Sequence, residues 1–133
     1  MNKENLMIRE LTKAEEQVMQ ILWKLEESIV RDMVDHFSEP KPAYNTVSTV
    51  LRVLEKKGFV GRKKIGNLNL FTPSVSKTDY TKFQFGSLLK NYFNGSFPKM
   101  ATFFARENQL DISDLEAIMK EAEEELKNNN NKI

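Results

Sequence analysis

Apolar and polar residues near the start of the chain alternate with the period of an α-helix. Immediately before this pattern, Thr12 and Glu15 stand three residues apart. This is the arrangement of a capping box, in which a hydroxyl and a carboxylate satisfy the first free backbone amides of a helix. The pattern predicts a helix over residues 13–25, with four apolar side chains at spacings of three and four on its inner face: Val18, Ile21, Leu22 and Leu25.

A shorter amphipathic segment follows the first helix. Ser28 is suited to cap it, because serine side chains accept hydrogen bonds from the first amides of a helix. The stretch "SEPKPAY" contains two prolines and therefore predicts a turn or loop after this segment. We expect a second helix that runs to Phe37 and turns four side chains inward: Val30, Met33, Val34 and Phe37.

A third helix is predicted from about Asn45 to Gly58, a residue that commonly ends helices. At 100° per residue its two sides differ sharply in polarity. One side is apolar: Val47, Val50, Leu51 and Leu54. The opposite side is a polar stripe roughly 100° wide, formed by Asn45, Ser48, Thr49, Arg52 and Lys56.

The next segment has the signature of a β-hairpin. The apolar-containing runs "FVGRKKI" and "LNLFTP" flank Gly66-Asn67, a pair that suits a tight turn, and Pro73 ends the second run. Three helices followed by a basic hairpin is the order of a winged helix-turn-helix domain.

Three more helices are predicted beyond the hairpin, near residues 79–92, 96–106 and 113–127. The fold class is therefore mainly α with a small antiparallel sheet. We expect a winged-helix DNA-binding domain over residues 1–75 and a helical dimerisation domain over residues 76–133.

Charge is distributed unevenly along the chain, although the net charge is only +1. Seven cations stand against one anion between Lys41 and Gly66, whereas eight anions stand against two cations between Glu107 and Lys127. A basic middle and an acidic tail indicate regions with different partners.

The polar stripe of the third helix suits a DNA major groove, which admits an α-helix and presents patterns of donors and acceptors. Arg52 can pair with guanine, Asn45 with adenine, and Thr49 can offer its methyl group to thymine. Cations flanking the stripe, including Lys57, suit phosphates; Tyr44 either stacks on a sugar or phosphate or covers the edge of the core. The candidate DNA-binding residues are Lys41, Tyr44, Asn45, Thr46, Ser48, Thr49, Arg52, Lys56, Arg62, Lys63 and Lys64.

The C-terminal segment is rich in aromatic residues, yet it is too short to bury them alone. It either folds back on the first helix or, as we expect, joins an interlocked homodimer that supplies two recognition helices to a two-fold operator. The candidate dimerisation residues are Leu88, Leu89, Tyr92, Phe93, Phe97, Met100, Phe103, Phe104, Leu115, Met119, Ala122 and Leu126.

Other classes of function find little support in the sequence. The absence of cysteine excludes thiol catalysis and thiolate metal sites, and His36 has no second ligand at metal spacing. We expect no enzyme, cofactor or metal, although a small hydrolase using His36 and a winged helix that binds an acidic protein partner are alternatives. The chain has no apolar run of membrane-spanning length and its start lacks a signal-peptide core, so we expect a cytoplasmic location.

Three stretches resemble the penicillinase repressor family, the BlaI/MecI/CopY type of bacterial transcriptional repressor, over nearly the whole chain. "LTKAEEQVMQILW" resembles the first helix of the family, and "YNTVSTVLRVLEKKGFV" its recognition helix and the turn into the wing. "LLKNYFNGSFPKMATFF" resembles its dimerisation region. The resemblance implies a homodimer of winged helices that binds an inverted-repeat operator and blocks transcription.

The resemblance also bears on how repression is relieved. In the beta-lactam branch a membrane sensor leads to cleavage between Asn and Phe in the dimerisation region, which implies a sensor-linked protease as a partner acting near Thr102-Phe103. Thr102 replaces the Asn here and argues against that route. In the copper branch a cysteine cluster senses the metal, and this chain has no cysteine.

Overall fold

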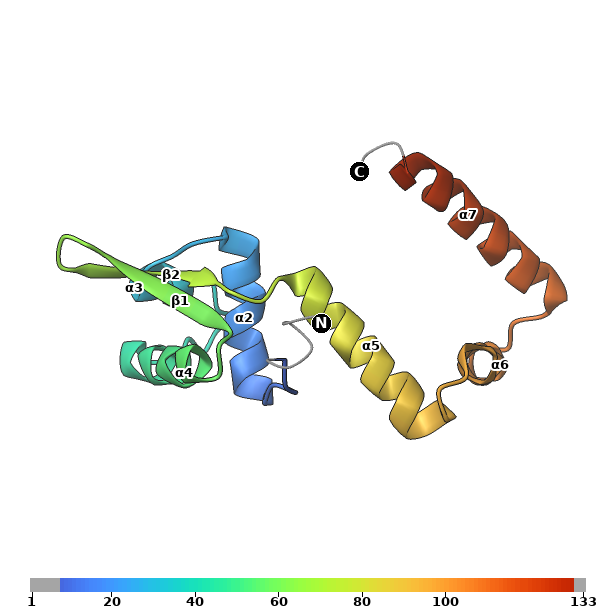
Figure 1. Ribbon diagram of the computed structural model, residues 1–133, viewed down its shortest axis with the longest axis horizontal. Helices are drawn as coiled ribbons and strands as arrows, with labels where there is room; N and C mark the ends of the chain where they lie inside the picture. The colour runs from blue at the N-terminus through green and yellow to red at the C-terminus, as the bar shows by residue number, and fades with distance from the viewer. Residues whose placement is uncertain (1–7, 131–133) are drawn as a thin grey trace, which may run out of the picture. The chain divides into compact units, whose positions relative to one another are not determined.

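Helix α2 (Lys13–Leu25) begins at the capping box and has the bounds that the sequence predicts. In the computed structural model, which describes residues 8–130, the Glu15 amide donates to the Thr12 hydroxyl at 3.2 Å. The Thr12 amide donates in turn to the Glu15 carboxylate at 2.9 Å. Figure 1 shows α2 beside the other elements of the first unit, which reaches to Phe85.

Helix α3 (Val30–Asp35) is shorter than expected, and the prediction that Ser28 caps it is wrong. Ser28 instead pairs with Phe71 as an isolated antiparallel bridge, through backbone hydrogen bonds of 3.0 and 2.8 Å. This pairing holds Ser28 extended at the edge of the hairpin, so the helix starts at Val30, one residue later than a Ser28 cap would place it. Ile29 is then the N-cap, and it makes no side-chain capping bond.

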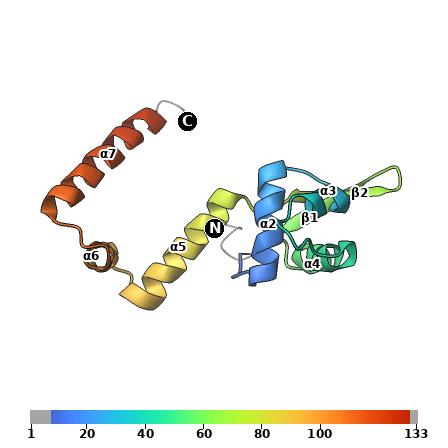
Figure 2. The same cartoon turned by 180° about the vertical axis from the view of Figure 1, so that it is seen from behind.

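Helix α4 (Tyr44–Lys56) is followed directly by the hairpin of β1 (Val60–Ile65) and β2 (Leu68–Pro73). Gly58 between them has a φ of 87°, a conformation that glycine adopts without steric cost. The strands pair antiparallel from Val60 opposite Pro73 to Ile65 opposite Leu68. This sheet and the helices around it confirm the predicted fold class, and both views show the hairpin and α4 extending to the same side of the unit (Figures 1 and 2).

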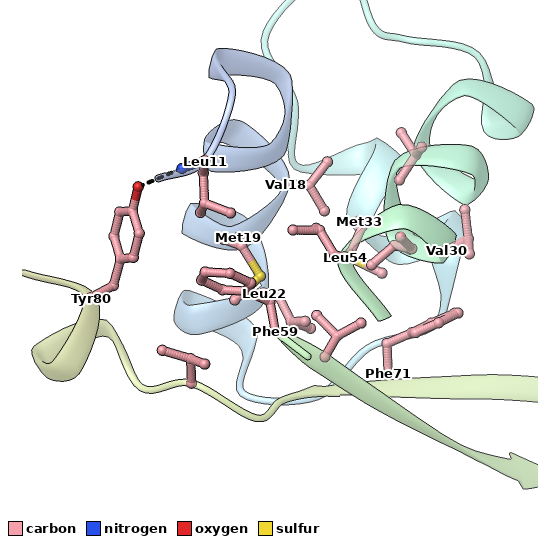
Figure 3. Packing of buried hydrophobic residues seen from close by; sticks show 14 of the residues in the cluster. Leu11, Val18, Met19, Leu22, Val30, Met33, Leu54, Phe59, Phe71 and Tyr80 are labelled. Atoms are coloured by element: carbon pink, nitrogen blue, oxygen red, sulfur yellow. Dashed lines mark hydrogen bonds between the residues drawn. The ribbon is translucent and has the colours of Figure 1, made fainter. Parts of the chain in front are cut away.

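The core of the first unit is built from all of its elements (Figure 3). Complete burial of each large side chain contributes about 1.5–3 kcal/mol. Val75 and Tyr80 also belong to this core, so its packing continues beyond the hairpin into the next helix. The largest fully buried side chains are Met19, Leu22, Met33, Val47, Leu51, Leu54 and Phe59.

Tyr80 closes the core from α5 (Lys77–Phe93). Its ring lies within 5.9 Å of the rings of Trp23, Phe59 and Phe83, and its hydroxyl accepts a hydrogen bond of 2.8 Å from the Leu11 amide. Trp23 is half-buried and donates to the Val75 carbonyl at 2.8 Å, as a core residue would.

The second unit begins at Gly86 and contains α6 (Phe97–Glu107) and α7 (Ile112–Asn130). The Ser96 hydroxyl caps α6 by accepting from the Lys99 amide at 3.2 Å. Within this unit the rings of Phe93 and Phe103 lie 5.6 Å apart. The three predicted C-terminal helices are therefore present, with ends displaced by up to three residues.

Candidate nucleic-acid interface

Helix α4 presents a polar face outward because its apolar face is anchored in the core. Val47, Leu51 and Leu54 are at most 1% exposed, whereas the stripe residues other than half-buried Ser48 are exposed. Thr46 is exposed as well. Helix α4 is thus amphipathic, as the sequence predicts, and its polar side is accessible to a binding partner.

Two side chains in the first half of α4, Tyr44 and Thr49, are exposed to solvent. Tyr44 is 57% exposed, so it does not cover the edge of the core. Thr49 donates its hydroxyl hydrogen to the Asn45 carbonyl at 2.8 Å. This bond engages the hydroxyl group of Thr49 within the helix, and the side chain as a whole is exposed.

The hairpin carries exposed cations on both of its faces. Successive side chains of a strand point to opposite sides, so Lys63 projects away from the side that carries Arg62 and Lys64. Arg62 stands opposite buried Phe71 in the register, and its guanidinium carbon lies 5.4 Å from the centre of that ring. Lys63 and Lys64 are exposed on the hairpin that corresponds to the wing.

An ion pair joins the hairpin to the last turn of α4. Arg62 Nη2 lies 2.7 Å from Glu55 Oε1, and Arg62 Nε donates to the same carboxylate at 3.0 and 3.2 Å. The hydrogen bonds from Arg62 hold the pKa of Glu55 below its ordinary value, against the smaller opposing effect of burial. Arg62 is therefore engaged within the protein, although about a third of its side chain is exposed.

Lys57 does not belong to this outward face, contrary to the suggestion that it suits a phosphate. Its ammonium lies 2.8 and 2.9 Å from the two carboxylate oxygens of Glu15, whose side chain is 8% exposed. Burial raises the pKa of Glu15, but the hydrogen bonds from Lys57 and Thr12 outweigh it and leave the pKa below 4.5. Lys57 thus ties the end of α4 to the capping box of α2.

Arg31 is a cation that the sequence reasoning missed. It follows buried Val30 in α3, is exposed, and lines a cavity together with Tyr44 and two other arginines. Its sequence neighbours do not mark it as a binding residue, because the cavity forms only when α3, α4 and the hairpin pack together. Lys41, which was predicted, is exposed and donates to the Asp35 carbonyl at 2.9 Å.

His36 is exposed, and its Nδ1 lies 2.9 Å from the Asp32 carbonyl oxygen. Over residues 8–130, no group of three or more His, Cys, Asp or Glu side chains is placed to hold a metal ion. No helix in that same range is both long and apolar enough to cross a membrane.

The candidate dimerisation residues lie on α5, α6 and α7. Leu89, Phe93 and Met100 are half-buried, and the other nine are exposed. On α7, every side chain from 112 to 129 is exposed, including 68% of Met119 and 65% of Leu126. Thr102 and Phe103 stand inside α6, where the Thr102 hydroxyl donates to the Pro98 carbonyl at 2.8 Å.

Helices α2, α3 and α4 followed by a basic hairpin define a winged helix-turn-helix protein, a class of DNA-binding transcription regulators. The model of the penicillinase repressor family matches residues 11–124. The chain therefore belongs to the penicillinase repressor family.

Two relatives agree with this assignment by sequence. The chain is 28% identical to the penicillinase repressor of Bacillus licheniformis over 86% of its own length and 92% of that protein. It is 24% identical to the methicillin resistance regulatory protein MecI of Staphylococcus aureus, over 82% of this chain and 89% of that one. The solution structure of monomeric Bacillus licheniformis BlaI in complex with the blaP half-operator is 28% identical, covers 55% of this chain and 90% of that chain, and has a TM-score of 0.47.

Proposed function

We propose that the protein is a transcriptional repressor that binds duplex DNA sequence-specifically as a homodimer and has no enzymatic activity. The observation that carries this proposal is the polar, exposed face of α4, flanked by cations of the hairpin and held outward by three buried side chains, Val47, Leu51 and Leu54. Family membership supports the repressor role. A DNA-binding repressor meets the chromosome in the cytoplasm, which we propose as its location.

We assign the reading of bases to α4. Arg52 can donate to guanine, Asn45 can pair with adenine, and the methyl group of Thr49 suits a thymine methyl. Thr46 and Ser48 belong to the same proposed contact surface.

We assign contact with phosphates to the surrounding cations. Lys41, Lys56, Lys63 and Lys64 are exposed and form no ion pair within residues 8–130. Phosphate contacts position the protein without reading sequence. Arg62 joins this group only if it exchanges its carboxylate partner, Glu55, for a phosphate.

We assign dimerisation to the helices beyond residue 75. The proposal is supported by the many apolar side chains that these helices expose, since large exposed apolar patches are typical of protein contacts. A two-fold dimer supplies two copies of α4, so the operator should be an inverted repeat with half-site centres about 34–36 Å apart or a multiple of that spacing.

Selection from a pool of random-sequence duplexes tests this function. Repeated binding and amplification with the full chain should enrich one inverted repeat, and a gel-shift assay should show tighter binding to that sequence than to the starting pool. Enrichment of no sequence, with binding no tighter than background, would contradict the proposal and favour a winged helix that contacts proteins.

A further inference from the structure

A cavity of about 110 Å³ lies between α3, α4 and the hairpin. Each of these elements contributes one arginine to its lining: Arg31, Arg52 and Arg62. Tyr44 and Ser48 of α4 add two hydroxyl groups, which can donate hydrogen bonds. The cavity therefore gathers positive charge and donors from consecutive elements of the chain, α3, α4 and the hairpin.

The charge of this lining is not balanced from within. No carboxylate lines the cavity among the described residues, and Glu55 binds Arg62 without being part of the lining. Neither Arg31 nor Arg52 forms an ion pair within residues 8–130. Guanidinium groups donate in a planar fork that matches phosphate oxygens, so an anion is the ligand that this lining suits.

The size of the cavity narrows the choice of anion. Sites for small organic ligands usually measure about 300–1,000 Å³, whereas this one has space only for a small group. A single phosphate group meets both the charge and the volume. Its position points to the source, because the cavity lies between α4 and the hairpin, the two elements that we propose meet duplex DNA.

We propose that this cavity receives one backbone phosphate of duplex DNA and that Arg31 is the side chain that holds it. The inference rests on the proposed function and adds to it a contact from α3. Arg31 lies outside the polar stripe of α4, so it contributes affinity without reading bases. Arg52 lines the same cavity but lies on the stripe, and its loss should change base preference as well.

The first test is the salt dependence of DNA binding by Arg31→Gln. Each phosphate contact contributes about 0.9 to the slope of log affinity against log salt. The variant should bind the enriched duplex and a random-sequence duplex more weakly by the same factor. Because each of the two subunits loses one phosphate contact, the slope should be smaller by about 1.8 for the bound dimer. Its defect should shrink about 12-fold between about 50 and about 200 mM salt, since a slope difference of about 1.8 acts over a fourfold change in concentration.

Lys24→Gln is the matched control, because it removes one exposed charge from a surface that Arg31 does not share. It should leave the affinity and slope at wild-type values. An Arg31→Gln slope equal to that of Lys24→Gln would overturn the proposal. If the wild type itself failed to bind DNA, the proposed function would fail first, so the two failures are distinguishable.

The second test locates the phosphate. Methylphosphonate linkages, each of which neutralises one phosphate, are placed one at a time along the enriched duplex. One linkage per half-site should weaken the wild type yet leave Arg31→Gln unaffected. If the variant remains sensitive at every linkage to which the wild type is sensitive, Arg31 holds no backbone phosphate.

Inorganic phosphate distinguishes the alternative source of the same chemistry. Added at constant ionic strength, it should displace DNA no better than chloride does. Strong displacement that Arg31→Gln abolishes would assign the cavity to a free anion and overturn the assignment to the DNA backbone.

Discussion

The hydrogen bond between the Tyr80 hydroxyl and the Leu11 amide should stabilise the first unit, because it attaches the start of α5 to the core of that unit. Tyr80 is 3% exposed, and Tyr80→Phe keeps its ring contacts while removing only the oxygen that accepts from the Leu11 amide at 2.8 Å. A buried amide left without a partner costs about 1–3 kcal/mol. In a unit of this size, each kcal/mol lowers Tm by about 4–8 °C.

Thermal unfolding followed by circular dichroism measures this change at one fixed protein concentration, since oligomerisation makes Tm depend on concentration. Tyr44→Phe is the matched control, because Tyr44 is 57% exposed in the same unit, lies outside the proposed dimer contact and should change stability by less than about 0.5 kcal/mol. Equal Tm values for the two variants would refute the reasoning that α5 closes this core.

The pH dependence adds a second signature of the same contact. Burial raises the pKa of Tyr80 above 10.0, as do the nearby carboxylates Glu16, Glu10 and Glu15, against the opposing hydrogen bond from Leu11. A raised pKa means that the contribution of neutral Tyr80 is complete below pH 10 and is lost as the pH rises through the folded-state value. Wild type should therefore lose stability in alkali more steeply than Tyr80→Phe does.

Three further variants test separate parts of the account. Glu55→Gln releases Arg62 and removes a carboxylate near the hairpin, so DNA affinity should rise for all sequences. The salt slope of the bound dimer should steepen by about 1.8, because each subunit gains one phosphate contact; an unchanged slope in filter-binding titrations contradicts this. Glu15 has a lowered pKa, so its ion pair stabilises the protein above pH 4.5 and is lost as the pH falls through the folded-state value. Glu15→Gln should then lower the free energy of unfolding by about 1–2 kcal/mol at neutral pH and by less in acid. A loss of unfolding free energy that does not vary with pH would exclude a stabilising role for the Glu15 ion pair. Met119→Glu should shift the protein toward monomer in analytical ultracentrifugation whereas Asn128→Glu should not; identical behaviour would remove α7 from the dimer contact.

Local sequence patterns predicted most elements of the fold. The capping box of Thr12 and Glu15 marks the start of α2, and the apolar period marks its length, because both signals lie within a few neighbouring residues. The same holds for the two-sided character of α4 and for the hairpin turn at Gly66. Signals of this kind depend only on backbone geometry and side-chain spacing.

Contacts between distant residues were not predictable in this way. Ser28 has the side chain of a typical N-cap residue. Its backbone instead forms two hydrogen bonds with Phe71 at the open edge of β2, and this pairing keeps it out of the helix. Lys57 resembles the other cations near the end of α4, and only the fold places it beside Glu15, 42 residues earlier. Arg31 acquires its neighbours in the same manner, because the cavity exists only when α3, α4 and the hairpin are packed together.

The central claim is that α4 reads base sequence, and the base preference of Arg52→Ala tests it most directly. The affinity of wild type and variant is measured for the enriched duplex and for every single base-pair substitution of it. The account predicts that the variant loses about 1–3 kcal/mol of discrimination at one base pair per half-site and keeps its preference elsewhere. A variant that retains the full wild-type preference at every position would contradict the claim.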